Sequence, residues 1–522
     1  MKKYITITFL TFAIAVSSCK KDFLSLEKNP NTPSVASPDL QLSGAIKQTA
    51  SIVNGTGYTM YASWIGYLSW STGYQANTAL EQYQITTSTY DVWTPLYLNL
   101  SNYKAVIDAN AGPNYVAIAK IMTVFDYEAL VDNYNNVPYT QALQGTKNLN
   151  PAYDSGSAIY DDLMKQLDAS IALIQGAPST AVNPAVGDII YKGNMTNWLK
   201  FANTLKLRLA LRQSNISAKT GALKAAVQAT AALGYIDATN PAAANPGYFN
   251  SDASGGQQSP LIIAYGITAS GGSSGNNATY QANAYAAHFY GVNNDPRLDQ
   301  VYSATQSKTA GATNVQNASI DSVSSNPQYV VVSSPFGSSS PPRATVGSST
   351  GNLNPSKFGP GVLKSQGQNA NILSSAESLF LQAEGAAAGY ILTPASAQGL
   401  YNAGIAASFA DDLVPNAAAA AAAYAAQPAI AYPVAGSFAV QQKAIIVQKW
   451  AALNLYGAFE AFNEFRRTGY PDDIPLSIYA GANAPNQVTR IPYPFVEYAT
   501  NASVVANQGT INIFTSKIFW AK

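Results

Sequence analysis

The sequence predicts an all-α protein whose helical body is interrupted by one long loop-rich insertion. In several segments apolar residues recur every three to four positions, as the buried face of a helix requires. Between about residues 245 and 370 this period disappears, and Gly, Ser, Asn and Pro dominate. A chain of 522 residues would by default form two or more domains. The pattern favours instead a single helical domain over residues 41–522 that contains the insertion.

The first residues have the features of an exported leader. Met1-Lys2-Lys3 is cationic, and residues 5–16 are apolar apart from three threonines, a run shorter than the ~20 residues that span a bilayer. Val16-Ser17-Ser18-Cys19 then resembles the bacterial lipobox, in which the cysteine thiol receives a lipid. Cys19 is the only cysteine, so an intramolecular disulfide cannot explain it. We expect residues 1–18 to be removed, Cys19 to be lipidated and residues 19–40 to tether the protein; an ordinary signal peptide with a chance cysteine is the alternative.

The mature chain is almost neutral. Without Lys2 and Lys3, 29 − 2 = 27 basic side chains remain against 28 acidic ones. A protein that binds nucleic acid usually carries a clear basic excess, so the composition argues against nucleic acid as a partner. Only 11% of the residues are charged, whereas 33 Tyr and 6 Trp supply stacking and neutral hydrogen-bonding surface. This composition suits a neutral polar ligand.

The helical body rests on segments with a helical apolar period. In residues 159–174 the period is clearest, and Ser155 precedes it as a helix cap. The longest segment, 441–468, is predicted to end at Gly469 because Pro471 forbids continuation. The alanine run 417–423 is interpreted as a turn or a short helix without function. The predicted helices are 115–132, 159–174, 197–213, 376–390, 397–410 and 441–468.

Two groups of aromatic residues are candidates for a ligand site. Within residues 58–74, four aromatic residues recur at spacings of three, three and four among serines and threonines. Aromatic rings stack on the CH faces of sugars, while amides and hydroxyls bond to sugar hydroxyls. A helical aromatic stripe is, however, more often core than ligand site. The candidate ligand-binding residues are Trp64, Tyr67, Trp70, Tyr74, Gln75 and Asn77, together with Tyr265, Tyr280 and Tyr285 of the insertion.

The charged residues favour structure over catalysis. His288 is the only histidine, so a catalytic triad or a multi-histidine metal site would have to use it. The adjacent acidic pairs, such as Asp161-Asp162, do not supply the facing carboxyls that a glycosidase needs ~5 to 10 Å apart. Arg466, Arg467, Glu460 and Glu464 are spaced for ion pairing around one helix end. We therefore expect no catalytic residue, no metal site and no cofactor.

Short motifs along the chain resemble one known family. They are Lys21-Asp22-Phe23-Leu24 and Asn29-Pro30-Asn31-Thr32-Pro33 after the cysteine, Asp132-Asn133-Tyr134-Asn135-Asn136-Val137-Pro138-Tyr139, Tyr153-Asp154, Trp198-Leu199-Lys200-Phe201-Ala202-Asn203, Asp295-Pro296-Arg297-Leu298, Ala383-Glu384, Gln448-Lys449-Trp450, Arg466-Arg467-Thr468-Gly469-Tyr470-Pro471 and Arg490-Ile491-Pro492-Tyr493-Pro494. By their order and spacing the chain resembles the SusD/RagB-like nutrient-binding outer-membrane lipoproteins of Bacteroidetes. It departs locally: Asn135 replaces a glycine, Asn194 an aspartate and Phe462 a tryptophan that relatives often carry.

The resemblance implies both a fold and a partner. It implies tetratricopeptide-like helix pairs in a right-handed superhelix, with the ligand site in the loop-rich region, although no 34-residue repeat is visible in the sequence. It also implies a SusC-like TonB-dependent transporter, to which a glycan or oligosaccharide would be delivered from the outer face of the outer membrane. Two alternatives remain open: a peptide ligand, since aromatic and amide surfaces also suit peptides, and a lipid-anchored glycoside hydrolase.

Overall fold

The computed structural model describes residues 36–70, 77–251, 257–302, 358–392, 396–474, 476 and 486–522. Within them helices dominate, and strands occur only as two-stranded antiparallel ribbons. The expected signal sequence, Cys19 and most of the expected tether lie outside the described residues. None of the described helices combines the length and hydrophobicity needed to cross a bilayer.

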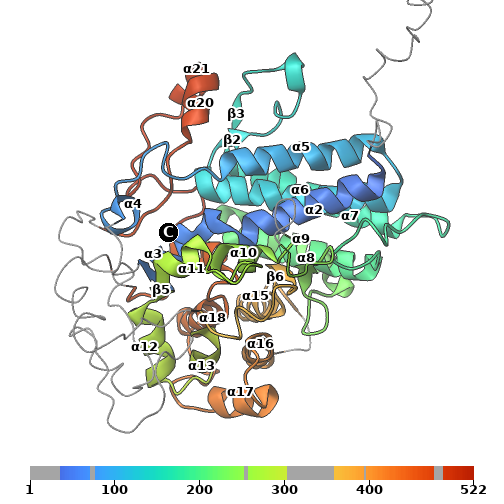
Figure 1. Ribbon diagram of the computed structural model, residues 1–522. Coiled ribbons are helices and arrows are strands. Elements are labelled where there is room, and N and C mark those ends of the chain that lie inside the picture. The colour runs from blue at the N-terminus through green and yellow to red at the C-terminus, as the bar shows by residue number, and fades with distance from the viewer. Residues whose placement is uncertain are drawn as a thin grey trace, which may run out of the picture.

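The N-terminal half contains a row of long helices in which α2 packs on α5, α5 on α6, α6 on α7 and α7 on α8 (Figure 1). Side-chain caps start several of them: Ser155 accepts from the Ala158 amide at 3.3 Å, as predicted, and Asn194 accepts from the Asn197 amide at 3.2 Å. Asn194 therefore performs the capping role of the aspartate that it replaces. The helices are α2 (Pro38–Asn54), α3 (Thr59–Trp64), α4 (Thr78–Glu81), α5 (Trp93–Ala109), α6 (Pro113–Tyr134), α7 (Gly156–Gln175), α8 (Met195–Arg212) and α9 (Thr220–Ala229).

In the C-terminal half, α15, α16, α17 and α18 form a second helical layer, drawn below the first in Figure 1, whereas α20 and α21 are drawn above the first layer. A separate small hydrophobic core around Phe380, Tyr401 and Ile445 holds α15, α16 and α18 together. The alanine run is a helix, α17, which packs on α16. The helices here are α15 (Ser375–Ala387), α16 (Ala397–Asp411), α17 (Ala417–Ala425), α18 (Phe438–Ala452), α19 (Ala458–Thr468), α20 (Phe495–Thr500) and α21 (Ala502–Ala506).

The prediction of one helix over residues 441–468 is wrong. The chain forms α18 and α19, with a turn between them in which Leu455 has a left-handed φ of 67°. This conformation is costly for a leucine and interrupts the helix, although the apolar face of Ile446, Trp450 and Leu453 is buried as expected. The predicted end of α19 is confirmed, because Gly469 caps it with a φ of 82°.

The described part of the insertion contains only short elements. They are α10 (Pro260–Tyr265), α11 (Gly275–Thr279), α12 (Ala284–Val292) and α13 (Leu298–Val301), none of which was predicted from the apolar period. Three two-stranded ribbons connect separate segments of the chain. They pair β1 (Leu68–Trp70) with β5 (Tyr280–Ala282), β2 (Val137–Pro138) with β3 (Tyr153–Asp154), and β4 (Ala242–Ala244) with β6 (Ala370–Leu373). Asn135, before β2, takes a φ of 66°, so it replaces the glycine of relatives as predicted.

Candidate functional site

The aromatic run of residues 58–74 is not one helix. After α3 the chain turns at Gly66, whose φ is 83°, and then continues as the strand β1. A side chain at residue 66 would meet the Tyr285 ring, since a Cβ there would lie 2.6 Å from Tyr285 Cδ1. Gly66 is thus required both for the turn and for the close approach of Tyr285.

Trp64 and Tyr67 are core residues, which corrects the expectation that they bind ligand. Both side chains have no exposed surface, so they cannot stack on a ligand in this conformation. Trp64 packs edge-on against Tyr61 with ring centroids 5.7 Å apart, and Tyr67 donates to the Trp450 carbonyl at 2.5 Å. The alternative interpretation of the stripe, as core, holds for these two residues.

Trp70 occupies a different environment, at the end of the β1–β5 ribbon. It is half-buried and lies opposite Tyr280 in register, with the two rings edge to face and their centroids 5.1 Å apart. Tyr280 itself is only 7% exposed and Tyr265 only 4%, and Tyr265 hydrogen-bonds to Thr59. Tyr280 is therefore part of the ribbon and Tyr265 packs against Phe358, and both side chains are buried, contrary to the expectation that they bind ligand.

Tyr285 lies on α12, directly after β5, where its ring approaches Gly66. It is half-buried against Trp450, with ring centroids 5.4 Å apart, and its hydroxyl donates to Oδ1 of the exposed Asp473 at 2.5 Å. Burial, together with the neighbouring Asp473, raises the pKa of Tyr285, so the hydroxyl stays protonated. We name Trp70, Tyr285 and Asp473 the ribbon site; Trp70 lies at one end of the ribbon, opposite Tyr280, and Tyr285 lies beyond the other end, beside Gly66. Asp473 was not predicted, because no local pattern links it to residues two hundred positions earlier.

The remaining candidates are less informative. Tyr74 and Gln75 lie outside the described residues. Asn77 is the N-cap of α4, where its side chain accepts from the Leu80 amide at 3.1 Å. Asn77 has a structural role there.

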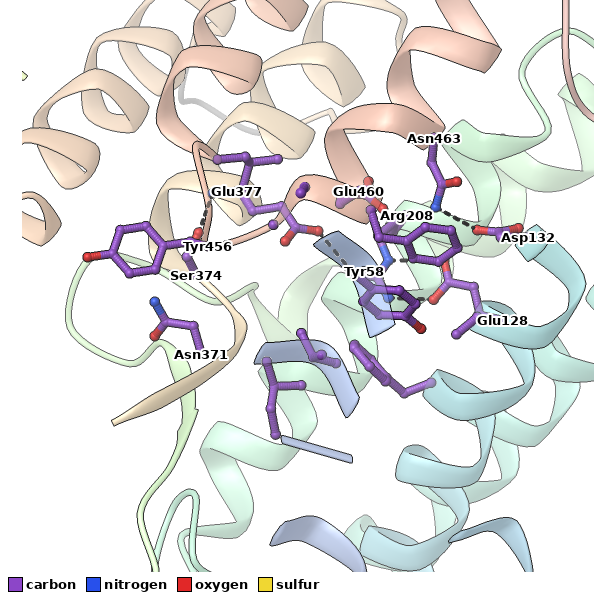
Figure 2. A pocket seen from close by; sticks show the side chains of 18 residues that line it. Tyr58, Glu128, Asp132, Arg208, Asn371, Ser374, Glu377, Tyr456, Glu460 and Asn463 are labelled. Carbon is purple, nitrogen blue, oxygen red and sulfur yellow. Dashed lines mark hydrogen bonds and ion pairs between the residues drawn. The ribbon is translucent and has the colours of Figure 1, made fainter. Parts of the chain in front are cut away.

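A buried ionic cluster forms the largest group of charged residues in the interior. Figure 2 shows its edge, around a cavity of about 50 Å³. Arg208 holds both oxygens of Glu128, at 3.0 and 2.5 Å, and donates its third contact to Glu377 at 3.0 Å. Lys449 bonds to Glu460 at 2.9 Å and to Glu464 at 2.8 Å. These charges join α6, α8, α15, α18 and α19.

The predicted ion pairing at the end of α19 is confirmed for Arg467 but not for Arg466. Arg467 pairs with Glu464 and also with both oxygens of Glu384, at 2.8 and 2.6 Å. Arg466 donates instead to the carbonyls of Asp132 and Thr489, at 2.7 and 2.9 Å. The sequence analysis did not predict the wider cluster, although charged residues four positions apart on otherwise apolar helices indicated it.

These carboxylates do not form the pair of unbonded carboxyl groups that could act as general acid and general base in a hydrolase. Those facing the cavity are bonded to Arg208, Arg212 or Lys449, which suits a structural role. Asp161 pairs with Lys219, and Asp162 accepts from Tyr139. In the described ranges, no group of three or more His, Cys, Asp and Glu side chains is placed to hold a metal ion.

Comparison with known proteins gives a consistent result. A family model for SusD-like proteins, described as "Starch-binding associating with outer membrane", matches residues 30–494. No curated protein matches the chain. Similar solved structures include an outer-membrane protein from Bacteroides vulgatus described as involved in nutrient binding (TM-score 0.74, 22% identity, 93% of this chain and 100% of that one). A chitin-binding SusD homologue from Flavobacterium johnsoniae is also similar (TM-score 0.70, 22% identity, 92% and 98%).

The match covers nearly the whole described chain and both helical layers. It confirms the predicted all-α fold of tetratricopeptide-like helix pairs. The chain belongs to the SusD-like family of starch-binding, outer-membrane-associated proteins.

Proposed function

We propose that this protein is a cell-surface lipoprotein that binds a glycan without cleaving it and delivers it to a TonB-dependent transporter. The ribbon site supports this proposal: Trp70 and Tyr285 are both aromatic, half-buried and held by defined contacts, and Asp473 beside Tyr285 is exposed. A fixed ring loses little entropy when it stacks on a sugar, and a carboxylate accepts hydrogen bonds from sugar hydroxyls. The family's association with starch, and the chitin-binding relative, favour a glycan over a peptide.

Replacing Trp70 or Tyr285 with alanine is expected to weaken binding of maltohexaose or of chitohexaose. One aromatic contact contributes ~0.5 to 1.5 kcal/mol, which corresponds to a roughly 2- to 10-fold loss of affinity per substitution. Isothermal titration of the parent and the variants measures this. Tyr498→Ala is the matched control, because Tyr498 is 37% exposed but lies on α20.

Two outcomes would contradict the proposal. If the number of reducing ends rises when either sugar is incubated with the parent, the protein is a hydrolase. If the parent binds a glycan and both ribbon-site variants bind it equally well, the ligand site lies elsewhere. A thermal melt of each variant shows whether a loss of affinity reflects unfolding.

Protease added to intact cells is expected to release the protein, because the proposed lipid at Cys19 would hold it on the outer face of the outer membrane. A Cys19→Ala variant, which cannot be lipidated, should no longer be found in the membrane fraction of lysed cells. Cleavage of the parent only after the outer membrane has been opened would place the protein in the periplasm instead.

A further inference from the structure

The buried ionic cluster is unbalanced in charge. Six carboxylates, Glu128, Asp132, Glu377, Glu384, Glu460 and Glu464, form ion pairs with four cations, Arg208, Arg212, Lys449 and Arg467, and all ten residues are less than 9% exposed. The nearby Arg466 and Arg490 direct their guanidinium groups to backbone carbonyls instead. An uncompensated buried charge costs several kcal/mol, as an order of magnitude, so the extra negative charge needs a partner.

Glu377 is the carboxylate with the weakest compensation. Glu128 has both oxygens on Arg208, and Glu460 has one oxygen on Lys449 and the other on Arg212. Asp132 accepts from Tyr160, Trp520 and Asn463. Glu377 has a single side-chain bond, from Oε1 to Arg208, which it shares with Glu128.

The surroundings of Glu377 favour its neutral form. Glu377 and Glu460 line the same small cavity, where Figure 2 shows Glu377 turned toward Arg208. Burial, followed by repulsion from Glu460, raises the pKa of Glu377 to about 7 against the opposing attraction of Arg208 and Lys449. A metal ion is a poor alternative partner, because nowhere among the described residues are three or more His, Cys, Asp or Glu side chains placed to hold one.

We propose that Glu377 carries a proton in the folded protein, which reduces the excess negative charge among the ion-paired groups, and that loss of this proton weakens the packing of α15 on α8. The proton comes from water and returns to it, so no other reactant is needed. The protonation of Glu377 changes the stability of the fold with pH in one direction. A carboxyl that holds its proton more tightly when folded stabilises the fold at low pH, and this stabilisation is lost as pH rises through the folded pKa.

Replacing Glu377 with glutamine tests this proposal, because glutamine mimics the protonated acid and keeps an oxygen for Arg208. Between about pH 5 and pH 7 the folding equilibrium constant of the parent should fall by up to about tenfold per pH unit more than that of Glu377→Gln. Denaturant titrations at several pH values measure this difference. Buried carboxyls that do not interact with Glu377 are present in both proteins and cancel in the comparison.

Glu384→Gln is the matched control, since Glu384 has both oxygens on Arg467. It should destabilise the protein at every pH without changing the slope. Independently, an infrared difference spectrum of parent minus Glu377→Gln at pH 6 should show the carbonyl stretch of a protonated carboxylic acid. Equal pH slopes, or no such band, would overturn the proposal. So would stabilisation of the parent, but not of the variant, by Na⁺ or K⁺ at constant ionic strength, which would identify a bound cation.

Discussion

Replacing Arg212 with methionine is expected to lower the free energy of unfolding by at least ~3 to 5 kcal/mol. The Arg212 guanidinium pairs with Glu460, lies 3.4 Å from Asp132 and 3.6 Å from Glu464, and covers the Trp520 ring at 5.2 Å. Methionine fills much of the volume but leaves these buried carboxylates without a shared cation. Chemical denaturation at pH 7 measures the loss, and the deficit should shrink at lower pH as the carboxylates take up protons.

Lys104→Met provides the contrast for Arg212. Lys104 pairs with Asp108 at 2.6 Å one helical turn away, a geometry as good as that of the buried pairs, but the two side chains are 44% and 60% exposed. Exposed pairs of this kind contribute less than about 0.5 kcal/mol, because water and salt screen them. If both variants lost the same small amount of stability, the interior cluster would be as weak as a surface pair.

The sequence predicted the helices of the first layer where one face is apolar, as in α7. The sequence did not show that residues 441–468 form two helices, because Trp450 and Leu453 continue the apolar period up to the turn. Only Gly457 indicates an interruption. The ionic cluster was within reach: Glu128 and Asp132, Arg208 and Arg212, and Glu460 and Glu464 are pairs of like charge four residues apart on helices that are otherwise buried. Such pairs repel unless another element supplies the opposite charge, so they indicate tertiary ion pairs.

The ribbon site could be predicted only in part. The aromatic residues near position 70 and those near 280 were both identified, but their pairing joins strands about two hundred residues apart, and no local pattern encodes such a pairing. The spacing of Trp64, Tyr67 and Trp70 was interpreted as one helical stripe. The turn at Gly66 instead directs the first two into the core and leaves Trp70 on the strand.

This division of the aromatic run predicts opposite phenotypes for two tryptophans six residues apart. Trp64→Ala is expected to cost ~3 to 5 kcal/mol of stability, because it leaves a cavity among Tyr61, Tyr90 and Phe462. Trp70→Ala should cost less, since the Trp70 side chain is only partly buried, at the end of the ribbon beside Tyr280.

Trp64→Phe separates loss of the ring from loss of the indole nitrogen. The Trp64 Nε1 has no hydrogen-bond partner among the described residues, so phenylalanine gives up no hydrogen bond and retains most of the packing. Its expected loss of stability is well below that of Trp64→Ala. Denaturant midpoints of the three variants measure these differences. Equal losses for Trp64→Ala and Trp70→Ala would mean that Trp70 is also a core residue, and that Tyr285 and Asp473 alone would have to account for ligand binding at the ribbon site.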